Sequence, residues 1–309
     1  MLLTFSIFIA LIIDLFFGEP RRWHPLVGFG NVANWLENYL NRTFIKSPFF
    51  TRFIGIVAWA LLIVPPVLLL WVIEQQNLSV LSYFILSVVC LAFAVGTNSL
   101  SQHARAVADA IKSSDLNLAR KKIAMIVSRD TINSDEIAIN KATIESVLEN
   151  GSDAIFAAIF WFVLLGAPGV VLYRLANTLD AMWGYRTERF NSFGWAAARI
   201  DDGLNWLPAR LTALSYALTG NIRSALSCWQ KQAKFWHGIN PGVVMASGAG
   251  ALNIKLGGVA VYHGESIQRP VLGCNDIPQA TDIDRSIQLV NKSIIIWLLV
   301  IAVGDYYIG

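Results

Sequence analysis

The sequence predicts an all-α, polytopic integral membrane protein with about four to five transmembrane helices and additional cytoplasmic helices. Of its 309 residues, 55% are hydrophobic and only 15% are charged, whereas soluble domains average about a quarter charged. The mean hydropathy is +0.52. The chain also contains 11 Trp and 17 Phe, and large aromatic rings favour membrane interfaces and the contacts between packed helices.

Five apolar runs are candidate membrane spans. The clearest is 53–73, which has 21 residues without a charge, and about 20 apolar residues suffice to cross the hydrocarbon core. Pro65 and Pro66 lie inside this run and predict a kink. The segment 204–218 contains a proline and an arginine, so we expect a buried or interfacial helix there. The other candidate spans are 78–95, 2–17, 293–308 and 154–173.

Lys and Arg near the ends of the runs predict the orientation, because cytoplasmic loops are enriched in them. The turn 74–77 has none, whereas 21–52 has five and 99–153 has seven. We therefore expect a multi-pass protein of the cell inner membrane with a cytoplasmic active site. A full crossing by 154–173 would leave four arginines outside. Either this run, which a Gly-Ala-Pro-Gly sequence should break, is re-entrant, or 204–218 crosses back.

We expect a single membrane-embedded domain over 1–309. Within it, 96–153 forms a cytoplasmic helical segment and 173–292 a motif-rich cytoplasmic or interfacial segment. Helical spacing of apolar residues supports helices in the first of these. Asn133 followed three residues later by Glu136 predicts a capping box at a helix start.

The first polar cluster surrounds Asp14 at the end of the first apolar run, where Glu19 and His24 follow closely. An ionisable residue inside a spanning helix is costly and usually faces a cavity or a partner. Asp14 is therefore a functional candidate. The alternative is an end residue whose side chain reaches the interface and pairs with an arginine.

The second cluster begins with Arg129 and Asp130 and continues with Glu145 and Glu149. The two glutamates are four residues apart, so they lie on one side of a helix, and paired carboxylates can bind Mg²⁺. The alternative is a solvated face on which Lys141 pairs with Glu145.

The third cluster places Arg174, Asn177 and Asp180 three residues apart, with Tyr185 and Arg186 shortly after them. A guanidinium beside aromatic rings suits phosphate and planar ligands. The same residue types also form ordinary interface belts in membrane proteins.

The fourth cluster combines adjacent acids with amides and arginines. Adjacent acids with Asn favour a divalent-cation site, although such residues also cap helices. The glycines that follow match neither a Walker A loop nor GxGxxG, and they are expected to allow close helix packing. The cluster is Arg199, Asp201, Asp202, Asn205 and Arg210, followed by Asn240 and the glycines Gly248, Gly250, Gly257 and Gly258.

Several functional classes are excluded by composition and spacing. A net charge of +3 is too small to argue for nucleic acid. The three cysteines form no CxxC pair and the four histidines no zinc-binding spacing, so neither zinc nor a disulfide framework is indicated. Acids outnumber nucleophiles in the clusters, which favours metal-assisted phosphate chemistry over acyl-enzyme chemistry.

Taken in order, these clusters resemble the CobD/CbiB family of cobalamin biosynthesis, the membrane-bound adenosylcobinamide-phosphate synthases. The resemblance extends almost end to end. Its motifs are the segment 14–25 with HPL and Gly28, SRDT at 128–131, ATIESVLENGSD, YRLANTLDAMWGYR, FGWAAARIDDGLNWLPAR, and the LGG and Tyr-x-Gly pattern at 256–264.

The resemblance implies ATP-dependent joining of the propionate carboxyl of adenosylcobyric acid to the amine of 1-amino-2-propanol phosphate. ATP and Mg²⁺ are the implied cosubstrates, without Zn. The implied partners are these small molecules and membrane lipid, with other membrane proteins of the cobalamin pathway as candidates and no nucleic acid.

Residue type and motif membership then suggest individual roles. The catalytic candidates are Asp14, Glu19, His24, Arg129, Asp130 and Glu145. The substrate-binding candidates are Arg174, Asn177, Asp180, Tyr185, Arg186, Arg199, Asn205, Arg210 and Asn240. The candidate Mg²⁺ ligands are Asp130, Glu145, Glu149, Asp201 and Asp202, with Asp180 as a further one. We expect these residues to converge at one cytosolic site.

The chain departs from the family pattern around 237–252, where Met245 stands at a position at which an acid is common. The chief alternative function is a non-catalytic membrane sensor or assembly factor on the same fold, because fold alone does not decide function. A transporter is a third possibility, which the location of the polar clusters mainly outside the spans argues against.

Overall fold

A computed structural model of the chain describes residues 1–18, 25–41, 47–262 and 264–308. These residues are predominantly helical, and the chain divides into two compact units. The first unit contains 97–156 and 206–309 together with Met1, and the second contains 2–96 and 157–205. Each unit is described by itself below.

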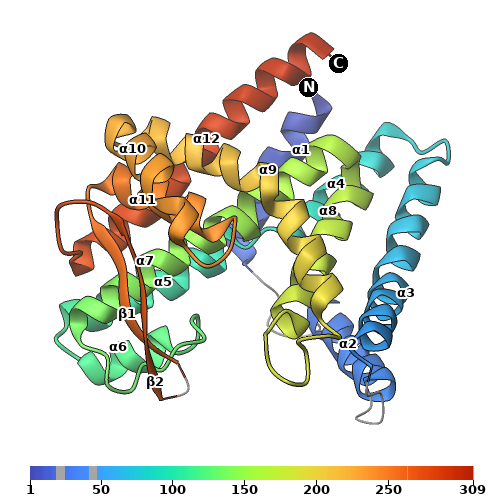
Figure 1. Cartoon of the computed structure of the whole chain (residues 1–309). Coiled ribbons are helices and arrows are strands. Elements are labelled where there is room, and N and C mark those ends of the chain that lie inside the picture. Colours follow the sequence, from blue (N-terminus) through green and yellow to red (C-terminus); the bar gives the residue numbers. More distant parts are fainter. Residues whose placement is uncertain (19–24, 42–46, 263, 309) are drawn as a thin grey trace. The chain divides into compact units, whose positions relative to one another are not determined.

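The helices follow the apolar and amphipathic runs of the sequence (Figure 1). Their bounds are α1 Leu2–Phe17, α2 Pro25–Leu40, α3 Pro48–Glu74, α4 Val80–Ala94, α5 Thr97–Lys112, α6 Leu116–Ile123, α7 Glu136–Gly151, α8 Ala157–Trp183, α9 Trp195–Thr219, α10 Ile222–Gln232, α11 Pro241–Leu252 and α12 Ala280–Ile308. A π-helical turn, Ser152–Phe156, joins α7 to α8.

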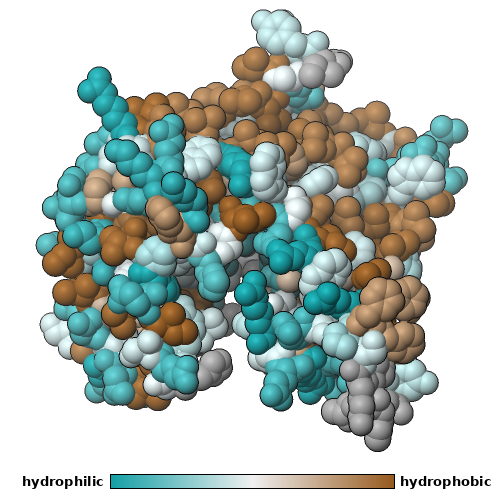
Figure 2. All heavy atoms as spheres, viewed as in Figure 1, coloured by the Kyte–Doolittle hydropathy of each residue, from teal (hydrophilic) through white to brown (hydrophobic). Residues whose placement is uncertain are grey.

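Among the described residues, four helical stretches are long and apolar enough to cross a membrane, which confirms the predicted class of helical polytopic membrane protein. They contain four of the five predicted spans, while α1 is a shorter apolar helix and α9 is not among them. Figure 2 shows apolar side chains gathered along α3, many of them exposed in the isolated chain. The four stretches are Pro48–Glu74, Val80–Lys112, Glu136–Trp183 and Ala280–Tyr307.

The predicted break in 154–173 is present in α8. Gly166 has φ 63° and ψ −150°, far from helical values, and a left-handed φ of this kind favours glycine. The Glu74 carboxylate accepts a hydrogen bond of 3.2 Å from the Ala167 amide just after the break. An acid at the start of a helical segment is favourable because backbone N–H groups there lack helical partners. In contrast, α3 continues as one helix through Pro65 and Pro66.

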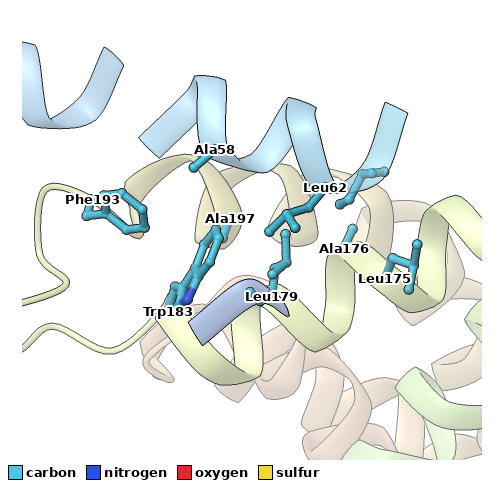
Figure 3. Close-up of a cluster of buried hydrophobic side chains, with 10 residues drawn as sticks. Ala58, Leu62, Leu175, Ala176, Leu179, Trp183, Phe193 and Ala197 are labelled. Carbon is cyan, nitrogen blue, oxygen red and sulfur yellow. The ribbon is translucent and has the colours of Figure 1, made fainter. Parts of the chain in front are cut away.

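The core of the second unit lies where α3, α8 and α9 meet (Figure 3). Leu175 and Leu179 of α8 are buried there. Both α3 and α4 pack against α8, and α4 also packs against α1. A Cβ at Gly55 would lie 2.0 Å from the Phe193 carbonyl oxygen, which explains a glycine in this part of α3.

The core of the first unit is built around α11, in which every residue from Gly242 to Leu252 is buried. Close helix packing at two glycines confirms their predicted role. A Cβ at Gly248 would lie 2.6 Å from the Leu148 side chain, and one at Gly250 would lie 2.8 Å from the backbone of the neighbouring α10. Met245, at the position that departs from the family pattern, is buried in this helix.

The sequence did not predict the antiparallel hairpin of the first unit. Strands β1, Lys255–Tyr262, and β2, Glu265–Gly273, pair beside α7 (Figure 1). The assignment of Gly257 and Gly258 to helix packing is therefore wrong. They have φ of +74° and +84° and lie at a β-bulge, a feature that often needs glycine and re-aims nearby side chains.

The start of α7 also differs from the prediction. Asp135, not Asn133, is the N-cap, and its carboxylate accepts a 2.7 Å hydrogen bond from the Ala138 amide. The predicted capping box is wrong because the chain enters the helix two residues later. Two acids, Asp135 and Glu136, still lie at this end of the helix, where negative charge is favourable.

Candidate functional site

The centre of the site in the first unit is Glu145, a carboxylate only 2% exposed. Its Oε2 accepts hydrogen bonds from Arg129 at 2.5 Å and from Arg269 at 2.9 Å. Its Oε1 accepts bonds from Arg269 at 3.2 Å and from the Gly257 amide at 2.8 Å. A carboxylate offers about four acceptor sites, and all four are used.

Three segments bring these groups together. Glu145 comes from α7, Arg269 from β2, and Arg129 from the loop before α7. Asp130 fixes that loop to the hairpin, since its amide donates to the Val261 carbonyl at 2.9 Å and its Oδ2 accepts from the Gly264 amide at 2.7 Å. The SRDT segment is thus held against the hairpin by both backbone and side chain.

A pocket of about 600 Å³ opens beside this cluster. Arg129, Lys141 and Arg269 line it, together with Asp130 and Asp135. The alternative in which Lys141 pairs with Glu145 is wrong, because the Lys141 Nζ donates to the Gly257 carbonyl at 3.3 Å. Its positive charge therefore remains available to the pocket.

The charges around the deep part of the pocket do not balance. Arg129, Lys141 and Arg269 are three positive side chains, and two nearby acids, Glu145 and Glu149, oppose them, while Asp130 and Asp135 are exposed. Arg129 and Arg269 are 14% and 12% exposed, so screening by water is reduced at this point. Guanidinium groups held in this way suit oxyanions such as phosphate.

The residues that the sequence suggests as Mg²⁺ ligands do not form a complete set of protein ligands around one point. The described residues contain no group of three or more His, Cys, Asp or Glu side chains that could hold a metal ion. Glu145 has no acceptor site left for a metal, which argues against it as a ligand alongside Glu149. Asp130 and Asp135 are the acids that line the pocket.

We predict that Gly257→Ala disrupts this site. A Cβ at this left-handed position would lie 2.1 Å from the Pro270 carbonyl oxygen, so the bulge must shift and its amide must leave Glu145. The expected cost is about 2–4 kcal/mol, from strain plus a lost hydrogen bond to a charged group. The measurement is the unfolding temperature in detergent. An unchanged value would contradict the account, and Gly264→Ala, where a Cβ has open space but φ is also positive, controls for strain alone.

The second polar cluster lies in the second unit and is centred on Asp201. Asn177 donates to its Oδ1 at 3.2 Å and Asn205 donates to its Oδ2 at 3.0 Å. The buried Tyr173 hydroxyl donates to the Asn205 carbonyl oxygen at 2.9 Å. These bonds join α8 to α9 through polar groups from two of the family-like motifs.

Other charged residues surround this network. Asp180 lies over Gly184, where a Cβ would come 2.0 Å from its Oδ1, and Asp201 and Asp202 both act on it electrostatically. Asp202 pairs with Arg199 at 3.3 Å on a more exposed surface. The Arg174 Nε is buried without a hydrogen-bond partner among the described residues.

The network predicts a pH-dependent stability. Burial raises the pKa of Asp201 from 3.8 to about 6, with the charge of Asp202 adding to the rise and the two Asn donors opposing it. The folded protein therefore holds this proton more tightly than the unfolded chain. The stabilisation is complete below about pH 4 and is lost as the pH rises through 6. The unfolding temperature should fall between pH 5 and 7 more steeply in wild type than in Asp201→Asn, and equal slopes would contradict this.

The remaining candidates lie apart from these two networks. Asp14 is 2% exposed on the buried face of α1, so it does not reach out to the interface as an end residue would. The Arg210 guanidinium donates to the Trp206 carbonyl at 2.6 Å and to Asn240 Oδ1 at 3.1 Å. Tyr185 and Arg186 are exposed in the loop after α8. Their proposed roles stay predictions, and Glu19 and His24 lie outside the described residues.

Two residues of the first cluster were missed by the sequence reasoning. Lys141 was considered only as a surface partner of Glu145, and Arg269 was not considered at all. The pair Gly257-Gly258 followed by the short apolar run Val259 to Tyr262, rich in β-forming residues, was the available signal, since such a pattern is compatible with a strand that carries a bulge. A strand there would have drawn attention to the arginine on its partner.

The fold and the site define a helical membrane protein with a cation-lined pocket formed by a helix, a loop and a hairpin. The chain belongs to the CobD/CbiB family, because the model described as "CobD/Cbib protein" matches residues 7–290. This family resemblance was predicted from the motifs and is confirmed.

Curated relatives support the same family. The protein named "Cobalamin biosynthesis protein CobD" of Stutzerimonas stutzeri is 51% identical over 97% of both chains. The protein of the same name from Chromobacterium violaceum is 51% identical, over 97% of this chain and 96% of the relative. The one from Mycobacterium tuberculosis is 35% identical, over 92% of this chain and 90% of the relative. No solved structure matches the chain.

Proposed function

We propose that this protein catalyses the ATP-dependent amide ligation of adenosylcobyric acid with 1-amino-2-propanol phosphate. The observation that carries the proposal is the pocket lined by Arg129, Lys141 and Arg269, because every step of this reaction handles phosphate groups. The chain belongs to a family of cobalamin biosynthesis proteins, which supports a corrinoid as the second substrate.

The proposed reaction has two steps. A carboxylate oxygen of the corrinoid propionate attacks the γ-phosphorus of ATP, and ADP leaves. The amine nitrogen then attacks the acyl carbon of the resulting acyl phosphate, and phosphate leaves with the proton that the amine loses. Guanidinium groups fixed before the reaction stabilise the charge on the phosphoryl oxygens, which is usually the largest catalytic contribution.

Each residue of the first cluster has a role in this proposal. Arg129, Arg269 and Lys141 bind the phosphate oxygens. Glu145 is a positioning residue, since it fixes both guanidiniums and has no free acceptor site. Asp130 and Asp135 would hold Mg²⁺ together with the substrate phosphates, because Mg²⁺ usually takes one or two carboxylates plus phosphate oxygens. Bound there, Mg²⁺ would neutralise charge on the transferring group.

The test is an assay of purified protein in nanodiscs with adenosylcobyric acid, 1-amino-2-propanol phosphate, ATP and Mg²⁺. We expect one ADP for each amide formed. Arg269→Gln should lower kcat/KM for ATP about 100-fold, a typical loss for one charged transition-state donor. Arg223→Gln, a matched change at an exposed position of α10, should leave it unchanged. Absence of turnover in the wild type would favour a non-catalytic sensor or assembly factor.

We further propose that the pocket opens on the cytoplasmic side of the inner membrane. The excess of Lys and Arg in 99–153 supports this orientation, because cytoplasmic segments are enriched in these residues. Ile132 lines the pocket and is 80% exposed, so a cysteine there should be easy to label. We expect Ile132→Cys to react with an impermeant maleimide only after the cells are opened. Labelling in intact spheroplasts at the same rate would overturn this orientation. Wild type controls for Cys90, Cys228 and Cys274.

A further inference from the structure

The pocket of the first unit is graded from buried cations to exposed aliphatic side chains. Arg129 and Arg269 are 14% and 12% exposed. Ile132, Ile137 and Val259 line the same pocket and are 80%, 42% and 63% exposed. The two guanidiniums therefore lie deep, and these three larger aliphatic side chains lie toward the opening, whereas the small Ala260 of the lining is buried.

This gradient restricts the ligand. An anionic group must reach the floor, and an apolar or planar body must remain near the opening, where it would cover aliphatic surface that is otherwise in contact with water. A pocket of about 600 Å³ is in the usual range for a whole small ligand. A free phosphate or a short amino-alcohol phosphate would leave the aliphatic part unused.

The exposed acids of the pocket argue for a polyphosphate. Asp130 and Asp135 would repel a lone carboxylate or phosphate that enters past them. A ligand that carries a divalent cation reverses this effect, because Mg²⁺ bridges protein carboxylates and polyphosphate oxygens. The Asp130 Oδ2 accepts from the Gly264 amide and the Asp135 Oδ1 from the Ala138 amide, so each keeps one oxygen for such contacts.

We infer that this pocket is the nucleoside triphosphate subsite, with the phosphates on Arg129, Lys141 and Arg269 and the base against Ile132, Ile137 and Val259. The inference rests on the proposed function and deepens it, because it says which of the three substrates the pocket takes. It also explains how the chain binds ATP without a Walker A loop: the loop, the first turns of α7 and the hairpin replace it.

The test measures binding without turnover. Equilibrium dialysis of the full-length protein in nanodiscs with Mg²⁺ uses labelled ATP, and inorganic tripolyphosphate serves as the ligand that lacks a base. We expect Ile132→Ser combined with Val259→Ser to raise the Kd for ATP about tenfold and to leave that for tripolyphosphate unchanged. Arg269→Gln should raise both by about tenfold or more. Ile277→Ser, at a position 58% exposed outside the pocket, should change neither.

The opposite results separate the two proposals. If the aliphatic double variant binds ATP as wild type does, the nucleotide subsite is wrong, whether or not the protein is a ligase. If it loses affinity for 1-amino-2-propanol phosphate or for adenosylcobyric acid instead, the pocket belongs to that substrate and the inference is overturned. If ATP binds as expected but no amide forms, the subsite stands and the ligase proposal fails.

Discussion

Glu145→Gln is expected to lower the free energy of unfolding by about 3–5 kcal/mol, the usual cost of removing one partner from a buried ion pair. Two guanidiniums, both nearly buried, would lose the carboxylate that pairs with both of them, and the Gln amide would place a donor against other donors. The proposed ligase activity should also fall at least 100-fold, because Arg129 and Arg269 would no longer be fixed toward the pocket. Chemical unfolding in detergent and the amide-forming assay measure the two effects.

A second substitution distinguishes the loss of the position of Arg269 from a general loss of stability. Arg269→Met in the Glu145→Gln background removes one of the uncompensated charges, so part of the lost stability should return, with a coupling energy of about 1–3 kcal/mol. The proposed activity should not return, because a group that we propose binds phosphate is gone. Purely additive losses of stability would mean that the two side chains do not depend on each other. The matched control is Lys112→Gln, which breaks an exposed pair with Asp284 and should leave the stability nearly unchanged, because water screens such pairs.

Asp201→Ala is expected to cost about 2–4 kcal/mol at pH 7. It leaves the amide groups of Asn177 and Asn205 without their acceptor, and each unsatisfied buried donor costs about 1–3 kcal/mol. Both amides lie between α8 and α9, so the loss should appear as a lower unfolding temperature of the whole protein and as faster proteolysis near 184–194. Thermal unfolding and limited proteolysis measure it.

The neighbouring acid provides the control for this prediction. Asp202→Ala removes a partner of Arg199 in a pair whose side chains are 58% and 35% exposed, and such pairs contribute less than about 1 kcal/mol. A similar loss of stability in both variants would contradict the central position given to Asp201. A loss of activity in Asp202→Ala with normal stability would instead support its proposed role in binding.

The membrane helices could be predicted because their signal is local. A run such as 53–73 must satisfy its backbone within itself to cross lipid, so length and the absence of charge are enough to identify it. The break at Gly166 was also predictable, since the residues that cause it are adjacent in the sequence. Asp14 was correctly identified as an unusual acid inside an apolar helix, and its burial follows from the same reasoning.

The hairpin and the pairing of Glu145 could not be predicted in this way. Arg269 is 124 residues from Glu145 in the sequence, and helical spacing around Glu145 pointed to Lys141 instead. A Gly-rich strand with a bulge also lacks the regular alternation by which strands are identified. The motifs therefore identified Arg129 and Glu145 as candidates, but the three-dimensional structure is needed to show that they form one hydrogen-bonded group with Arg269 of the hairpin.

The most direct test of the account follows the oxygen atoms of the corrinoid propionate. Adenosylcobyric acid labelled with ¹⁸O in that carboxyl is incubated with ATP, Mg²⁺, 1-amino-2-propanol phosphate and the purified protein. The account predicts that one ¹⁸O from each carboxyl appears in inorganic phosphate, with ADP as the nucleotide product. Unlabelled phosphate, or label that appears in AMP, would contradict a ligation that proceeds through an acyl phosphate.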